Sequence, residues 1–417
     1  MTLKHKLLAW ANQFPTAVYL DNNQYPSTGL HSWEVLVAVA SNFRGIALPA
    51  GQAFEALEQL RAAYPRQWLF GYLGYDLKNE VEDLQSNLFD GLEWPDMLFF
   101  VPDTVVGIRN QQLEVLHSET PPETLHRDIE QTPAMGPFIP ERPIELRPRL
   151  PKNEYLAAVE AIRHHILTGD IYEMNFCQEF FAENAFIDPA GTFFRLNGLS
   201  RAPFATYLKY QDKALMCSSP ERFLRKEGNK LVSQPIKGTR RRSQDPAEDA
   251  AIRQSLLESE KDRSENVMIV DLVRNDFARH CLPGTIKVEE LFGIYTFPTV
   301  HQMISTISGQ LPEGDPGLRA IRDAFPMGSM TGAPKVMSMQ LIERYERTRR
   351  GLFSGAVGYF TPDGDFDFNV VIRSLQYNKS TQYLSCIAGG AIVYDSVPEQ
   401  EYEECLLKTA AVRASVF

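Results

Sequence analysis

The clearest strand pattern of the chain lies in residues 351–394, where three apolar runs follow one another: 351–360 (GLFSGAVGYF), 366–377 (FDFNVVIRSLQY) and 383–394 (YLSCIAGGAIVY). The runs are rich in β-branched and aromatic residues, and turns containing Gly and Asp separate them. This pattern predicts three strands that pair as an antiparallel meander. Further strands are predicted at 17–20, 68–75, 97–106, 214–217 and 231–236. Helical spacing predicts helices at 52–64, at 153–168 with Asn153 as its N-cap, and at 250–278.

The composition is that of an ordinary enzyme. The chain has 417 residues, of which 44% are apolar and 23% are charged, so it can bury a large core. We expect a cytoplasmic protein, because no stretch has the length of a membrane span and the N-terminus lacks a cleavage pattern. Its five scattered cysteines predict neither a disulfide framework nor a zinc site. A net charge of −11 argues against broad nucleic-acid binding.

One lysine stands in a setting that suits covalent chemistry. Lys237 lies in the run 234–242 (QPIKGTRRR), between a short apolar strand and a glycine. A desolvated lysine amine can act as a nucleophile, whereas a lysine in an exposed basic turn has no such role. The basic residues 237–242 also keep open a function of another class, a nucleic-acid-binding module.

Two acidic pairs have the spacing of one helix face. Asp262 and Glu265 are three residues apart, and so are Glu401 and Glu404. Each pair alone is typical of a solvated helix surface. If the two helices faced each other, Mg²⁺ bound between them would have the oxygen ligands that it prefers.

Several motifs together show a resemblance. In order, these are residues 219–223 (SPERF), 235–239 (PIKGT), the run 261–276, 325–335 (FPMGSMTGAPK) and 388–390 (AGG). In order and spacing, residues 150–417 resemble the chorismate-utilising enzymes. The resemblance implies an α+β fold, a composite α/β/β/α sandwich with two large, mainly antiparallel sheets and helices outside. Residues 1–120 would contribute to the sandwich, the proline-rich residues 121–150 would cross a surface, and residues 151–417 would form the chorismate-binding catalytic domain.

With lysine at position 237, the chain resembles the branch of this family that aminates chorismate at C4, on the route to p-aminobenzoate and folate. The alternative is anthranilate synthase component I, although a small residue is usual there at this position. The resemblance also implies Mg²⁺ as cofactor, and ammonia from a separate glutamine amidotransferase subunit. None of the five cysteines has the Gly-x-Cys-x-Gly setting typical of a glutaminase nucleophile.

The resemblance further implies roles for individual residues. Lys237 would attack chorismate, and Glu221 would protonate the departing hydroxyl with Arg222 pointing away. Glu265 and Glu404 would hold Mg²⁺ directly, with Asp262 and Glu401 acting through water. Arg373 would bind the enolpyruvyl carboxylate with Tyr359 nearby. The other predicted substrate residues are Gly238, Thr239, Gln302, Thr331, Gly389, Gly390 and Lys408. The family often has histidine in place of Gln302, a third glycine in place of Ala391, and glutamate in place of Asp262.

Overall fold

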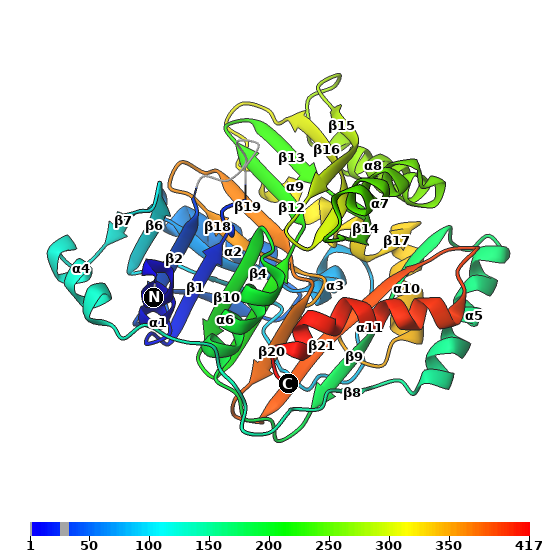
Figure 1. Cartoon of the computed structure of the whole chain (residues 1–417). Helices are drawn as coiled ribbons and strands as arrows, with labels where there is room; N and C mark the ends of the chain where they lie inside the picture. Colours follow the sequence, from blue (N-terminus) through cyan, green and yellow to red (C-terminus); the bar gives the residue numbers. More distant parts are fainter. Residues whose placement is uncertain (1, 26–32) are drawn as a thin grey trace.

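Two antiparallel sheets pack face to face, and helices cover their outer faces (Figure 1). The computed structural model describes residues 2–25 and 33–417. Side chains such as Val18 and Leu36 of one sheet and Phe70 and Tyr72 of the other fill the space between the sheets. Strands covered on both faces are apolar throughout, as in the fully buried run Val35–Ala40. The predicted α/β/β/α sandwich is confirmed.

Sheet A has eleven strands in the described part of the chain. In spatial order they are β17 (Gly332–Ala333), β9 (Glu173–Ala182), β21 (Tyr383–Ile392), β20 (Ser374–Asn378), β11 (Lys213–Ser219), β10 (Phe204–Tyr210), β1 (Thr16–Asp21), β2 (Val35–Ala40), β6 (Thr104–Arg109) and β7 (Gln112–Ser118), with β8 (Arg147–Pro148) beside β9.

Sheet B has ten strands among the described residues. They are β14 (Ile236–Arg241), β16 (Val300–Gln310), β13 (Lys230–Gln234), β12 (Arg222–Glu227), β19 (Phe366–Val370), β18 (Ala356–Phe360), β4 (Leu69–Leu73), β5 (Met97–Phe100) and β3 (Gly45–Leu48), with β15 (Lys287–Thr296) beside β16.

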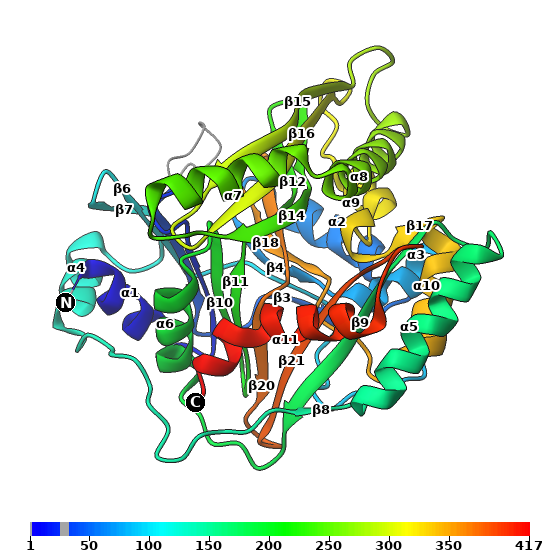
Figure 2. The same ribbon diagram turned by 45° about the vertical axis from the view of Figure 1, so that its right-hand side comes forward.

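The helices form the two outer layers (Figure 2). Those packed over sheet A or its edge are α1 (Leu3–Ala11), α4 (Pro122–Gln131), α5 (Lys152–Leu167), α6 (Pro189–Ser200), α10 (Lys335–Tyr345) and α11 (Pro398–Ala414). Those packed on sheet B are α2 (Ala53–Ala63), α7 (Pro246–Glu258), α8 (Glu260–Ala278) and α9 (Leu318–Ala324). Three short helical turns complete the set: η1 (Tyr75–Leu77), α3 (Lys78–Val81) and η2 (Gly328–Met330). In the described part of the chain, no helix combines the length and apolar composition needed to cross a bilayer.

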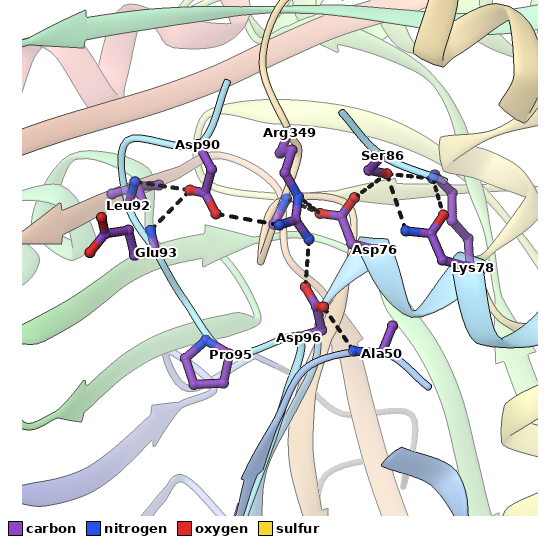
Figure 3. A network of polar contacts seen from close by, with 12 residues as sticks. Ala50, Asp76, Lys78, Ser86, Asp90, Leu92, Glu93, Pro95, Asp96 and Arg349 are labelled. Carbon is purple, nitrogen blue, oxygen red and sulfur yellow. Dashed lines mark hydrogen bonds and ion pairs between the residues drawn. The ribbon is translucent and has the colours of Figure 1, made fainter. Parts of the chain in front are cut away.

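The first 120 residues supply strands to both sheets, and a polar network fastens them to the rest. Figure 3 shows the guanidinium of Arg349, which follows α10, between the carboxylates of Asp76, Asp90 and Asp96. The nitrogen–oxygen distances are 3.5, 3.7 and 2.9 Å. Asp96 also accepts a hydrogen bond from the Ala50 amide at 2.9 Å. Because these groups lie far apart in sequence, the network links the two parts of the chain.

The predicted three-stranded meander is wrong. β18 and β19 pair in sheet B, whereas β20 and β21 pair in sheet A. The run predicted as one strand at 366–377 therefore divides, and the chain crosses between the sheets at residues 371–373, where Arg373 has φ of 54°. The run 97–106 divides in the same way into β5 and β6. Apolar alternation marks a strand, but it does not say which of two sheets the strand joins.

The predicted helix over 250–278 is broken at Ser259. This residue ends α7 and caps α8, and its hydroxyl accepts a hydrogen bond from the Asp262 amide at 3.3 Å. The break lets α8 take its own direction against β14 and β16. The predicted Asn153 cap is also wrong, since α5 begins at Lys152 with Pro151 at its N-cap position.

Candidate active site

Lys237 lies on a bulge of strand β14. Between Ile236 and Thr239 the pairing with β16 shifts by one residue, and Gly238 takes a left-handed φ of 85°. Such a bulge turns a side chain out of the regular alternation of the strand. A Cβ on Gly238 would lie 2.9 Å from Asp262 Oδ1, so glycine also permits the close approach of α8.

The amine of Lys237 is buried against a carboxylate. Its Nζ donates to Oε1 of Glu173 at 2.6 Å, and the two residues are 8% and 1% exposed. Glu173 is the first residue of β9, in the other sheet. Burial works against a charged lysine, but Glu173, followed by Glu265, outweighs it, and the pKa of Lys237 is raised. The amine is therefore held as an ammonium ion in this state.

Glu221 lies near Lys237, whose charge acts on it, but burial favours the neutral form of Glu221. It is 5% exposed, and its Oε1 accepts a hydrogen bond from the Ser329 hydroxyl at 2.7 Å. Burial raises the pKa of Glu221 to about 7, although Ser329 and the charge of Lys237 oppose the shift. Arg222 points away, as expected, and its guanidinium pairs with Asp367 at 2.8 Å. A carboxyl group with this pKa can hold and release a proton near neutral pH.

A buried arginine, Arg350, holds the backbone near Glu173 and Glu221. Arg350 is 2% exposed and pairs with Glu346 at 2.6 Å. It also donates to the carbonyls of Met330 at 2.6 Å and Asn175 at 2.8 Å. The first carbonyl belongs to the turn that carries Ser329, and the second to the strand that begins with Glu173. Arg350 thus links the turn of Ser329, which binds Glu221, to the strand of Glu173, which binds Lys237.

The four predicted metal ligands approach the pocket from two helices. The charge of Lys261 acts on Glu265, Glu401 and Glu404, so acids of both helices lie near the same lysine. Burial raises the pKa of Glu265 to about 7. Burial is also the main cause acting on Glu404, but Lys408, in contact at 2.6 Å, outweighs it and lowers the pKa of that carboxyl.

The donor chemistry of these acids fits a hard cation such as Mg²⁺. A Cβ on Gly390 would lie 3.2 Å from both Glu401 Oε2 and Glu404 Oε1, so the two carboxylates of α11 meet over that glycine. Asp262 fits less well, because its Oδ2 is bound to Arg240 at 2.6 Å. As arranged here, no three Asp, Glu, His or Cys side chains of the described residues are grouped to hold a metal ion.

The predicted substrate residues are placed unevenly. Arg373 lies where the chain crosses between the sheets. Burial lowers the pKa of its guanidinium, and the charge of Glu404 opposes that effect. Lys408 donates to the Gly389 carbonyl at 2.7 Å. A Cβ on Gly389 would collide with the Phe176 carbonyl, so this glycine permits close strand pairing. The Thr331 hydroxyl is directed back to the Met327 carbonyl at 3.3 Å.

Gln302 lies next to the bulge. It is 2% exposed, opposes Thr239 across β14 and β16, and donates to the Thr239 hydroxyl at 3.5 Å. Among the described residues its Oε1 has no hydrogen-bond partner. Gln302 therefore offers the pocket an acceptor where the family often has a histidine.

Tyr359 lies apart from these residues. Its ring stacks on Phe70 with centroids 5.5 Å apart, and it lines a separate cavity between the sheets that also contains Asp21 and Asn369. The structure does not bring Tyr359 to Lys237.

Sequence reasoning missed Glu173, and it left Ser329 and Arg350 without roles. The local signal for Glu173 is weak: it is an acid at the start of the strand EMNFCQEFFA, residues 173–182, which also carries Asn175, Gln178 and Glu179. Its partner is 64 residues away, and no local spacing rule reaches that far. The basic run is also accounted for within the chain, because Arg240 pairs with Asp262 and Arg242 with Asp249.

Comparison with known proteins identifies the family. The model of the chorismate binding enzyme family matches residues 19–414. Aminodeoxychorismate synthase component 1 of Escherichia coli (strain K12) is 37% identical over 342 residues, which cover 80% of this chain and 73% of that protein. Aminodeoxychorismate synthase of Streptomyces pristinaespiralis is 39% identical over 370 residues, which cover 83% of this chain and 50% of that protein. The chain thus spans half the length of the Streptomyces relative.

Solved structures show the same architecture. Anthranilate synthase component I from Streptococcus pneumoniae TIGR4 has a TM-score of 0.73 and 26% identity, over 83% of this chain and 80% of that one. The menaquinone-specific isochorismate synthase of Escherichia coli has a TM-score of 0.75 at 17% identity, over 98% of this chain and 91% of that one, and is similar in fold. The chain belongs to the family of chorismate-binding enzymes.

Proposed function

We propose that this chain aminates chorismate at C4 to give 4-amino-4-deoxychorismate, a precursor of p-aminobenzoate. The observation that carries the proposal is that a buried lysine, Lys237, lies within electrostatic reach of a buried, protonatable acid, Glu221. The names of the relatives from Escherichia coli and Streptomyces support the same reaction.

Glu221 acts as the general acid. The C4 hydroxyl of chorismate is a poor leaving group unless it is protonated, and a carboxyl group with a pKa of about 7 carries its proton at neutral pH often enough to supply it. Burial outweighs the hydrogen bonds from the Ser329 hydroxyl and the Ile236 backbone, which by themselves lower the pKa of this carboxyl group.

Lys237 acts as the nucleophile. Its nitrogen forms a bond to C2 while the ring double bonds shift and the C4–oxygen bond breaks, and the hydroxyl leaves as water with the proton of Glu221. Ammonia then forms a bond to C4, the double bonds return, and the bond from C2 to Lys237 breaks. The two displacements place the new amine on the carbon that lost the hydroxyl.

We propose Mg²⁺ as cofactor, held by Glu265 and Glu404, with Glu401 acting through water. Asp262 can join only by leaving Arg240. When bound, the ion would neutralise the ring carboxylate of chorismate and draw electron density from the ring. Arg373 and Lys408 are the cations of this chain that would bind the carboxylates of the substrate.

We propose that ammonia comes from a separate glutaminase subunit, as the name "component 1" of relatives suggests. All five cysteines of this chain are buried. Burial raises the pKa of Cys386 to about 12 and that of Cys405 to about 11. Such thiols are poor nucleophiles for glutamine hydrolysis.

Product identification with the wild type and a Lys237→Ala variant tests the function. The wild type supplied with chorismate, ammonium and Mg²⁺ should give aminodeoxychorismate by mass spectrometry, and Lys237→Ala should lose about two or more orders of magnitude of that rate. Lys230→Ala, at an exposed lysine of β13, serves as the matched control. Anthranilate and pyruvate from the wild type would support the alternative, an anthranilate synthase component I. Full activity of Lys237→Ala would refute the assignment of Lys237 as the nucleophile.

A further inference from the structure

The buried pair of Lys237 and Glu173 presents a chemical difficulty. An ammonium nitrogen has no lone pair, so Lys237 cannot attack C2 until it loses a proton. It is 8% exposed, which leaves bulk water a poor acceptor for that proton. The pocket itself must supply a base.

We propose that Glu173 is this base, a catalytic residue that takes the proton of Lys237 as the substrate binds. The proposal rests on the proposed function, in which Lys237 is the nucleophile. In the step, the bond from Nζ to its proton breaks and an O–H bond forms at Glu173 Oε1, which converts an ammonium and a carboxylate into a neutral amine and a carboxylic acid. The same proton returns to Nζ when ammonia displaces the lysine, so no outside acid or base is consumed.

Distance selects Glu173 among the acids around Lys237. The charges that act on the amine come from Glu173 on β9, Glu221 before β12, Glu265 on α8 and Glu404 on α11. Glu173 is in hydrogen-bond contact with the amine at 2.6 Å, so its Oε1 can accept the proton directly. Glu221 is required to give a proton at the other end of the reaction, and Glu404 is in contact with Lys408 at 2.6 Å.

The surroundings of Glu173 favour this transfer. It is 1% exposed, and among the described residues its Oε2 has no hydrogen-bond partner. A carboxylate with one unpaired buried oxygen is poorly stabilised as an anion, and an ion pair in such a place is costly once water is excluded. Substrate that closes the pocket therefore makes the neutral pair more favourable.

Trace acetylation with acetic anhydride and steady-state kinetics test the proposal on Glu173→Gln. Acetylation of Lys237, measured by mass spectrometry of its peptide over a pH series, reports how much of the amine is neutral. Glutamine keeps the shape but removes the charge, so Lys237 should become reactive at lower pH than in the wild type. At pH values where the amine of the variant is still protonated, kcat should nevertheless fall by about two to four orders of magnitude with KM little changed, because the proton acceptor is gone. The kcat should recover as the pH rises into the range where acetylation becomes fast.

The two readouts separate a base from a mere counter-charge. If acetylation and kcat both rise in Glu173→Gln, Glu173 only holds the lysine protonated and the proposal is overturned; unchanged kcat overturns it as well. Glu183→Gln, one residue past β9 with a 61% exposed side chain, is the matched control and should behave as the wild type. Should Glu173→Gln not fold, Glu173→Asp withdraws the acceptor by one methylene, and an undiminished kcat there would refute direct transfer.

The outcome is distinct from failure of the proposed function. Acetylation of Lys237 does not depend on turnover, so a shifted acetylation profile still reports the pairing with Glu173. If Lys237→Ala remained fully active, the nucleophile itself would be lost and the proposed function would fail first.

Discussion

Removal of the buried carboxyl group at Glu221 should change how stability depends on pH. Raising the pKa of this group from its ordinary 4.5 to about 7 corresponds to about 3 kcal/mol, since a tenfold change in an equilibrium is about 1.4 kcal/mol. Between these pH values the folded chain keeps a proton that the unfolded chain has released, so the free energy of unfolding falls as pH rises. The loss begins near the unfolded pKa and is complete just above the folded one. Glu221→Gln abolishes this titration.

Urea unfolding at about pH 5 and about pH 8 measures the effect, with fluorescence and circular dichroism followed together to verify a single transition. The wild type should lose more stability across this interval than Glu221→Gln, by about 3 kcal/mol. Glu265 also titrates at about 7 and should contribute equally to both proteins. Glu227→Gln, whose side chain is 69% exposed at the end of β12, should follow the wild type. An equal loss in Glu221→Gln and the wild type would refute the burial argument.

Two further predictions concern the cofactor and the nitrogen source. In calorimetry, Glu404→Gln and Glu265→Gln should each weaken the binding of both Mg²⁺ and chorismate. The control Glu403→Gln, with a 64% exposed side chain, should weaken neither. If chorismate bound equally well with and without Mg²⁺, these acids would have no role in metal binding. The purified chain given chorismate, Mg²⁺ and glutamine without ammonium should form neither product nor glutamate, whereas ammonium salts should support turnover, faster at alkaline pH where more ammonia is free. Steady product with released glutamate would reveal a glutaminase site within the chain.

Local sequence patterns predicted about half of the strands that the described residues form, because alternation and flanking turns depend on neighbouring residues; they missed long strands such as β9 and β16. They failed where the chain changes sheets. Residues 366–377 have one continuous apolar pattern, yet β19 lies in sheet B and β20 in sheet A. The fold class itself followed from the motif resemblance, which carries information about long-range pairing that apolar periodicity lacks.

The sequence predicted some residues of the candidate site and missed others. Lys237 lies near Glu221, and its charge interacts with acids of α8 and α11, whereas Tyr359 lines a separate cavity. Glu173 had no motif to mark it. A residue whose importance comes from one contact across 64 positions leaves no trace in local spacing.

The acids of this pocket show why contacts, and not burial alone, assign chemical roles. Glu173, Glu221 and Glu404 all lie near Lys237, yet only two of them touch a cation: Glu173 touches Lys237 itself, and Glu404 touches Lys408. Glu221 has a hydroxyl as its partner, so burial prevails and it keeps a proton near neutral pH. A pocket that must deliver a proton at C4 and remove one from a lysine needs acids in both states. The partner of each carboxylate, which comes from another strand or helix, therefore decides which of them can act as acid and which as base.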